Sequence, residues 1–143
     1  MEPKTKMDDI DISSTEAPLK IKKKFSRLIF DQNSEALQLL NSYKKLRKGA
    51  TLSPKDLELE KSLSERLGQL SEGLNAIENG SFLEDNSFAS YIKMIKTTVS
   101  TSKTVLAEKE KAVESMETIL KLKNEAENCM KYLEVKDDKD DVV

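Results

Sequence analysis

The side chains most often used in catalysis are scarce in this sequence. It contains no histidine and one cysteine, Cys129, and its four glycines are isolated rather than grouped in a phosphate-binding loop. A histidine base or metal ligand and a cysteine metal cluster are therefore excluded. Acidic residues are plentiful, but they lie beside lysines on polar faces, where nothing would raise a carboxyl pKa as acid–base catalysis requires. We expect no enzyme activity, no cofactor, no metal site and no small-molecule substrate.

Cysteine usage and hydropathy also indicate where the protein works. A lone cysteine cannot form an intramolecular disulfide, and we interpret Cys129 as a small apolar core or seam residue. No apolar signal segment opens the chain, and no apolar run approaches the ~20 residues that a membrane span requires. The net charge of −2 does not favour nucleic acid as a partner. We expect a cytoplasmic or nuclear protein.

One segment, residues 19–30 (LKIKKKFSRLIF), carries five basic residues and no acid. This basic patch consists of Lys20, Lys22, Lys23, Lys24 and Arg27. A basic amphipathic stretch can bind an anionic membrane surface or an acidic partner. The alternative, which we favour, is an ordinary helix start whose apolar residues join the core. Cations at a helix N-terminus are unfavourable, however, so the functional interpretation stays open.

The elements that carry these residues are predicted to be helices. Apolar residues make up 37% of the chain and charged residues 35%, and an apolar share below the usual ~45–50% supplies a narrow seam better than a thick core. The apolar residues recur at intervals of three and four, which is the helical spacing. The sequence therefore predicts an all-α fold of the coiled-coil or helical-bundle type.

Helix punctuation near residue 50 predicts an antiparallel helical hairpin. Gly49 follows a basic run, as is typical of a helix end. Ser53 can cap the next helix, Pro54 suits its first position, and Asp56 completes a capping box. We predict helices at about 19–48 and 54–79. Their seams are Phe25, Ile29, Gln32, Ala36, Leu39, Tyr43 and Leu46 in the first, and Leu63, Leu67, Leu70, Leu74 and Ile77 in the second.

Two glycines, Gly68 and Gly73, lie inside the second predicted helix. Each costs up to ~1 kcal/mol relative to alanine in a helix interior. Either they permit a close helix approach or the helix is soft. We favour the soft helix, because neither glycine lies on the predicted seam.

After Gly80 the chain contains no glycine and no proline, which predicts a long third helix over about 86–133. Such a helix would extend ~70 Å, whereas the two helices of the hairpin reach ~40 Å each. The β-branched and hydroxyl residues at 96–104 form a weak joint. Either the helix folds back there into a four-helix arrangement, or a partner covers its far end. A disordered acidic tail at 1–18 and an acidic tail at 136–143 flank the helical region at 19–135.

The far part of the third helix is the predicted partner-binding site. Its apolar stripe consists of Val113, Met116, Leu120, Ala126, Met130 and Leu133. We expect a different subunit as the partner, because Lys109 and Lys123 intrude on the seam and would place like charges opposite each other in a self-pair. The protein is thus predicted to be a non-catalytic subunit or adaptor of a hetero-oligomeric complex. In general texture it is similar to small coiled-coil subunits such as trafficking adaptors and kinetochore components. The alternative is a peripheral membrane-binding module acting through residues 19–30.

Overall fold

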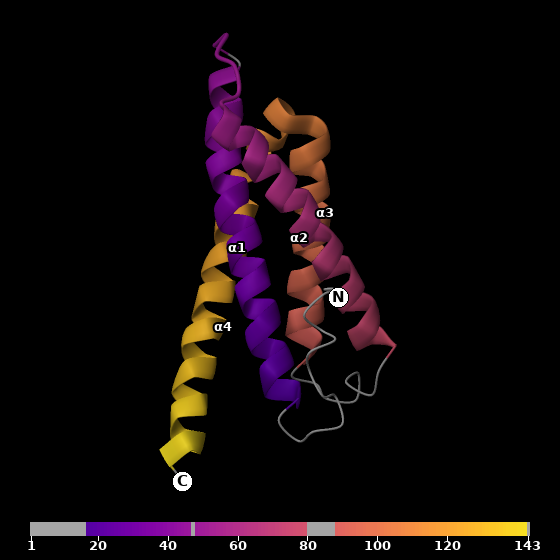
Figure 1. The fold of residues 1–143 in the computed structure, drawn as a ribbon, viewed down its shortest axis with the longest axis vertical. Coiled ribbons are helices and arrows are strands. Elements are labelled where there is room, and N and C mark those ends of the chain that lie inside the picture. The colour runs from indigo at the N-terminus through magenta and orange to yellow at the C-terminus, as the bar shows by residue number, and fades with distance from the viewer. Residues whose placement is uncertain (1–16, 47, 80–87, 143) are drawn as a thin grey trace.

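The computed structural model describes residues 17–46, 48–79 and 88–142, with side chains described between 19 and 133. These residues form four α-helices and one 3₁₀ segment: α1 (Ala17–Leu46), α2 (Pro54–Glu78), α3 (Phe88–Glu108), η3 (Lys109–Ser115) and α4 (Met116–Val142). The helices pack side by side along one axis (Figure 1). The prediction of an all-α helical bundle is confirmed. The predicted tail at 1–18 lies outside the described residues except for its last two, and the predicted tail from 136 is helical as far as Val142.

The predicted hairpin between α1 and α2 is confirmed, with its caps in place. The Ser53 hydroxyl accepts a hydrogen bond from the Asp56 amide at 3.1 Å, and the Asp56 carboxylate accepts one from the Ser53 amide at 3.0 Å. Pro54 is the first residue of α2. Gly49 adopts a left-handed φ of +92°, a conformation that glycine reaches without steric cost.

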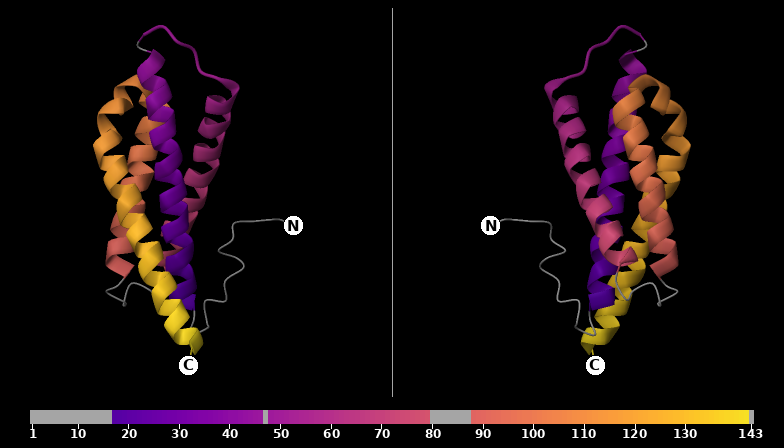
Figure 2. Two further views of the ribbon diagram at one scale, coloured as in Figure 1. Left: turned by 90° about the vertical axis from the view of Figure 1, so that its left-hand side faces the viewer. Right: turned by 90° about the vertical axis from the view of Figure 1, so that its right-hand side faces the viewer.

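The third predicted helix is divided in two. The expectation of one helix over 86–133 is wrong, because α3 ends at Glu108, η3 reverses the chain and α4 runs back along α1 (Figure 2). The reversal also lies beyond the weak joint predicted at 96–104, which is helical throughout. Some hydroxyls in that joint donate to the backbone of the same helix, as at Thr97, whose Oγ1 donates to the Lys93 carbonyl at 2.9 Å.

Buried polar contacts explain why residues 96–104 remain helical. The Gln32 side-chain amide donates to Ser102 Oγ at 3.1 Å, and that of Asn33 donates to Thr98 Oγ1 at 3.2 Å. Arg66 of α2 donates to the Gln32 side-chain carbonyl at 3.2 Å. These bonds join α1, α2 and α3 in one polar layer and outweigh the weak helix propensity of the hydroxyl residues.

The core surrounds α1, which packs against each of the other helices. The predicted seam of α1 is buried except for a partly exposed Leu46, and α2 buries Leu63, Leu70 and Ile77. The expectation that Gly73 merely softens α2 is wrong: a Cβ built there would lie 2.2 Å from Cζ of the buried Phe25 ring. Around Gly68 the space is open, so no close helix approach requires a glycine there. Gly73 therefore permits the close approach of α1 and α2.

Candidate partner-binding groove

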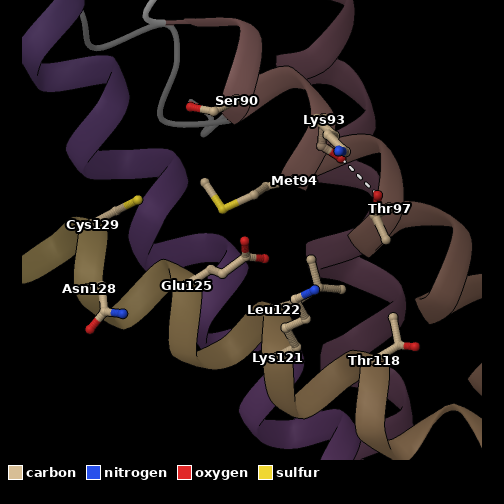
Figure 3. Close-up of a pocket in the computed structure, with 10 residues that line it drawn as sticks. All are labelled: Ser90, Lys93, Met94, Thr97, Thr118, Lys121, Leu122, Glu125, Asn128 and Cys129. Carbon is tan, nitrogen blue, oxygen red and sulfur yellow. Dashed lines mark hydrogen bonds between the residues drawn. The ribbon is translucent and has the colours of Figure 1, made fainter.

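A groove of about 540 Å³ lies between α3 and α4. It exists because α4 packs chiefly against α1 and only lightly against α3, although η3 joins the two directly. Figure 3 shows the side chains that line it, which are Ser90, Lys93, Met94 and Thr97 of α3 and Thr118, Lys121, Leu122, Glu125, Asn128 and Cys129 of α4.

The floor of the groove is apolar. Met94 is 7% exposed and Leu122 is 5% exposed, so both are largely embedded in the bundle. Cys129 is half-buried and packs against the core, as its interpretation as a small apolar residue requires. Figure 3 shows Met94 and the Cys129 thiol pointing toward one another from opposite walls. Methionine and cysteine are polarisable and adaptable, which suits a surface that accepts apolar side chains of varied shape.

The rim of the groove is polar and carries charge of both signs. Lys93 stands on the α3 wall, and Lys121 and Glu125 stand on the α4 wall; all three are exposed. The Thr97 hydroxyl is turned to its own backbone by its bond to the Lys93 carbonyl (Figure 3). The lining therefore offers an apolar floor between charged edges, but no nucleophile beside a general base.

Within the described ranges, no group of three or more histidine, cysteine, aspartate or glutamate side chains could hold a metal ion. None of the helices described is both long and apolar enough to cross a membrane.

The predicted partner-binding stripe is mostly covered by the chain itself. Ala126 and Leu133 are buried, Val113 and Met116 are partly buried against the core, Met130 is half-buried and Leu120 is 45% exposed. The stripe was expected to lack a cover because a ~70 Å helix would outrun its neighbours, and this premise fails because the chain folds back. The partner-binding role of these six residues stays a prediction, but the bundle no longer requires it.

The two lysines that intrude on the predicted seam both have partners within the chain. Lys109 Nζ lies 3.2 Å from Glu60 Oε2 of α2. Lys123 Nζ lies 5.8 Å from the centroid of the Phe30 ring of α1, within cation–π range. Their presence on the seam therefore follows from contacts between helices of the same bundle.

The basic patch surrounds an apolar face that is already in the core. Ile21, Phe25 and Ile29 are fully buried between the helices. The Lys22 ammonium lies 4.9 Å from the centroid of the Phe88 ring of α3, and Arg27 pairs with Asp31 at 3.4 Å. Lys20 is exposed, and Lys23 and Lys24 are partly buried. The apolar side chains of residues 19–30 would have to leave the core before they could enter a bilayer.

Sequence reasoning did not identify the groove residues Lys93, Met94, Lys121 and Leu122 as functional. Met94 precedes the apolar residue Ile95, and Leu122 lies two positions after the stripe residue Leu120, so both enlarge an apolar face without standing out from it. Their spacing along α3 and α4 gives no sign that the two helices lie apart. The signal appears only once the position of the reversal is known.

No known protein family, curated protein sequence or solved structure matches this chain.

Proposed function

We propose that this chain is a non-catalytic subunit or adaptor of a hetero-oligomeric complex in the cytoplasm or nucleus, and that it binds a helix of another protein in the groove between α3 and α4. The observation that supports the proposal is the groove itself, with an apolar floor at Met94, Leu122 and Cys129. A fifth helix placed there would pack against two neighbours, as helices of a bundle do.

The chemistry of the lining favours an amphipathic partner helix with an acidic residue. Apolar side chains spaced by three and four residues along that helix would meet the floor. Lys93 and Lys121 stand on opposite walls, so a carboxylate on the partner would lie between two ammonium groups. The volume of about 540 Å³ is enough for several side chains. The exposed, flexible residues of the rim suit a helix surface better than a small molecule, which usually binds among fixed polar groups.

Charge reversal on the rim tests this proposal without disturbing the core. A Lys93→Glu, Lys121→Glu double variant changes two exposed residues of the groove. The matched control, Lys44→Glu with Lys103→Glu, makes the same change of net charge at exposed positions outside the groove lining. Tagged wild type and both variants are used to capture partners from native extract, and the captured proteins are quantified by mass spectrometry.

The expected result is a partner captured by the wild type and the control variant but lost at least about tenfold with the groove variant. A loss of that size corresponds to the coupling energies measured for close charge pairs across interfaces. Equal capture by all three proteins would remove the groove from the binding site. Far-UV circular dichroism of the three proteins checks that the bundle is intact in each.

A further inference from the structure

A seven-residue repeat of buried positions runs unbroken through the reversal of the chain. Within the described residues, every seventh position from 91 to 133 is buried: Tyr91, Thr98, Val105, Ala112, Ile119, Ala126 and Leu133. The companion positions of the same heptads are Phe88, Ile95, Ser102, Lys109, Met116, Lys123 and Met130; the first three are buried, the last three are partly buried, and Lys109 is exposed. The repeat begins in α3, crosses η3 and continues in α4.

A chain reversal does not require such a repeat. When a helix ends and another begins, the face that the second helix buries is independent of the register of the first. An unbroken heptad is instead the pattern of one continuous helix that keeps a single seam toward its neighbours. η3 itself is seven residues long, the length of one heptad. The spacing of apolar residues over 88–133 is therefore compatible with one straight helix as well as with the bent arrangement.

The bend shows the local strain that such a conflict would produce. Lys109 has a φ of +45°, in the left-handed region that favours glycine. η3 is longer than the three or four residues usual for a 3₁₀ segment. The bend contains neither glycine nor proline, so nothing in its composition prevents it from becoming α-helical. The bend is held by contacts with other helices, such as the ion pair between Lys109 and Glu60 of α2.

We infer that α3, η3 and α4 have a second, straight state, and that in this state α4 packs against α1 of a second copy of the chain. Straightening withdraws α4 and uncovers the face of α1 on which it lay. The surface that fits this face of α1 is α4 itself. In a dimer, the α4 of each copy would cover the α1 of the other. The contact of Lys123 with Phe30 would then form between copies.

The expected dimer is long. The reversal lies at the same end of the bundle as the turn between α1 and α2, so two bundles would meet end to end there (Figure 1). The straight helix would run from residue 88 to 142 and measure ~80 Å, whereas α1 measures ~45 Å. Straightening also separates α3 from α4 and so abolishes the groove between them. This exchange of α4 between two copies does not rest on the proposed function. The exchange requires the straight state, whereas the groove requires the bent one.

Two substitutions at Lys109 separate the backbone requirement from the ion pair. Lys109→Ala and Lys109→Gly both remove the pair with Glu60. Alanine is penalised at positive φ and favours the straight helix, whereas glycine tolerates the bend and weakens the straight helix. The equilibrium constant between the bent and the straight state should differ by at least about tenfold between the two variants. Because a dimer contains two straightened chains, its dimerisation constant should differ by about a hundredfold.

The wild-type chain and both variants are unfolded in denaturant, refolded at high protein concentration and analysed by sedimentation velocity and small-angle X-ray scattering. We expect Lys109→Ala to give the most dimer, with a maximum dimension roughly twice that of the monomer, and Lys109→Gly to stay monomeric. The exchange is refuted if both variants are monomers, if both dimerise equally, or if the dimer is no longer than the monomer. Equal partner capture by wild type, the Lys93→Glu, Lys121→Glu variant and its control, with these results unchanged, would count against the proposed function alone.

Discussion

At the scale of single residues, a close contact between α1 and α2 depends on a missing side chain. Gly73 is buried against Phe25, whose ring is itself fully buried, so a methyl group at position 73 would have to displace a side chain that is packed in the core. Gly68 lies in the same helix with nothing near the position of its absent Cβ. The two glycines thus share a helix and a cost in propensity but differ in surroundings.

We expect Gly73→Ala to lower the free energy of unfolding by ~1–3 kcal/mol, because the new methyl group overlaps the Phe25 ring. Gly68→Ala should instead raise it by up to ~1 kcal/mol, since alanine is the better helix former and meets no neighbour. Urea unfolding followed by circular dichroism measures both. A stabilising Gly73→Ala would mean that α1 and α2 lie further apart than described.

Two buried tyrosines should make the protein sensitive to alkali. Burial raises the pKa of Tyr91 to about 12. Burial, and then the hydrogen bond that its hydroxyl donates to Glu60 at 2.5 Å, also raise the pKa of Tyr43 above its ordinary value. Both folded-state pKa values exceed the ~10 of an unfolded tyrosine. Their contribution to stability is therefore complete below about pH 10 and is lost as the pH rises through the folded-state values.

We expect Tyr43→Phe to reduce the fall in stability between pH 9 and pH 12. At pH 7 the same variant should cost ~1.5–3 kcal/mol, the net value of a hydrogen bond to a charged group. Tyr132→Phe is the matched control, because the Tyr132 side chain is 65% exposed. Denaturant midpoints measured across this pH range should run parallel for wild type and the control. Parallel curves for all three proteins would show that the pKa of Tyr43 is the same in the folded and unfolded states.

At the scale of elements, the orientation of α4 can be tested at two adjacent residues. Ile119 is fully buried, whereas Leu120, which the sequence placed on the apolar stripe, is 45% exposed. We expect Ile119→Ala to cost ~2–5 kcal/mol, through lost burial and the cavity left behind. Leu120→Ala should change stability by no more than ~0.5 kcal/mol. Thermal or urea unfolding separates the two, and the reverse order would mean that α4 presents another face to α1.

The first two helices could be predicted closely because local chemistry determines their ends and their faces. The cap at Ser53, the turn at Gly49 and the α1 seam depend on residues a few positions apart. The reversal at Lys109 has no such local signal, since it is held by a partner 49 positions away in Glu60. The groove depends on that reversal, so neither it nor the exposure of Leu120 could be derived from spacing alone.

The polar layer that joins α1, α2 and α3 also shows why local sequence alone could not predict the structure of residues 96–104. Local propensity placed a weak joint at 96–104, and the propensity argument was sound for an isolated helix. Thr98 and Ser102, however, meet Asn33 and Gln32 of α1 inside the bundle. A hydroxyl that competes with the backbone in water satisfies a buried amide in the core, and tertiary contact overrides propensity.

At the scale of the whole molecule, the folded bundle should not bind anionic membranes. Its basic patch surrounds apolar residues that are fully buried, so no apolar face of this segment is accessible to enter a bilayer. We expect no flotation with phosphatidylserine-containing liposomes at physiological salt. Flotation that disappears in a Lys22→Glu, Lys23→Glu, Lys24→Glu variant would favour the membrane-binding alternative over the groove.

The packing of α1 against α4 has a consequence for the chain as it is synthesised. α1 is complete once residue 46 has been added, but the helix that covers it begins only at residue 116, about 70 residues later. At ~5–20 residues per second, ribosomes take several seconds to make that stretch. During this interval one side of α1 has no cover of its own. Chaperones and the nascent chains of neighbouring ribosomes therefore meet that side of α1 before α4 does.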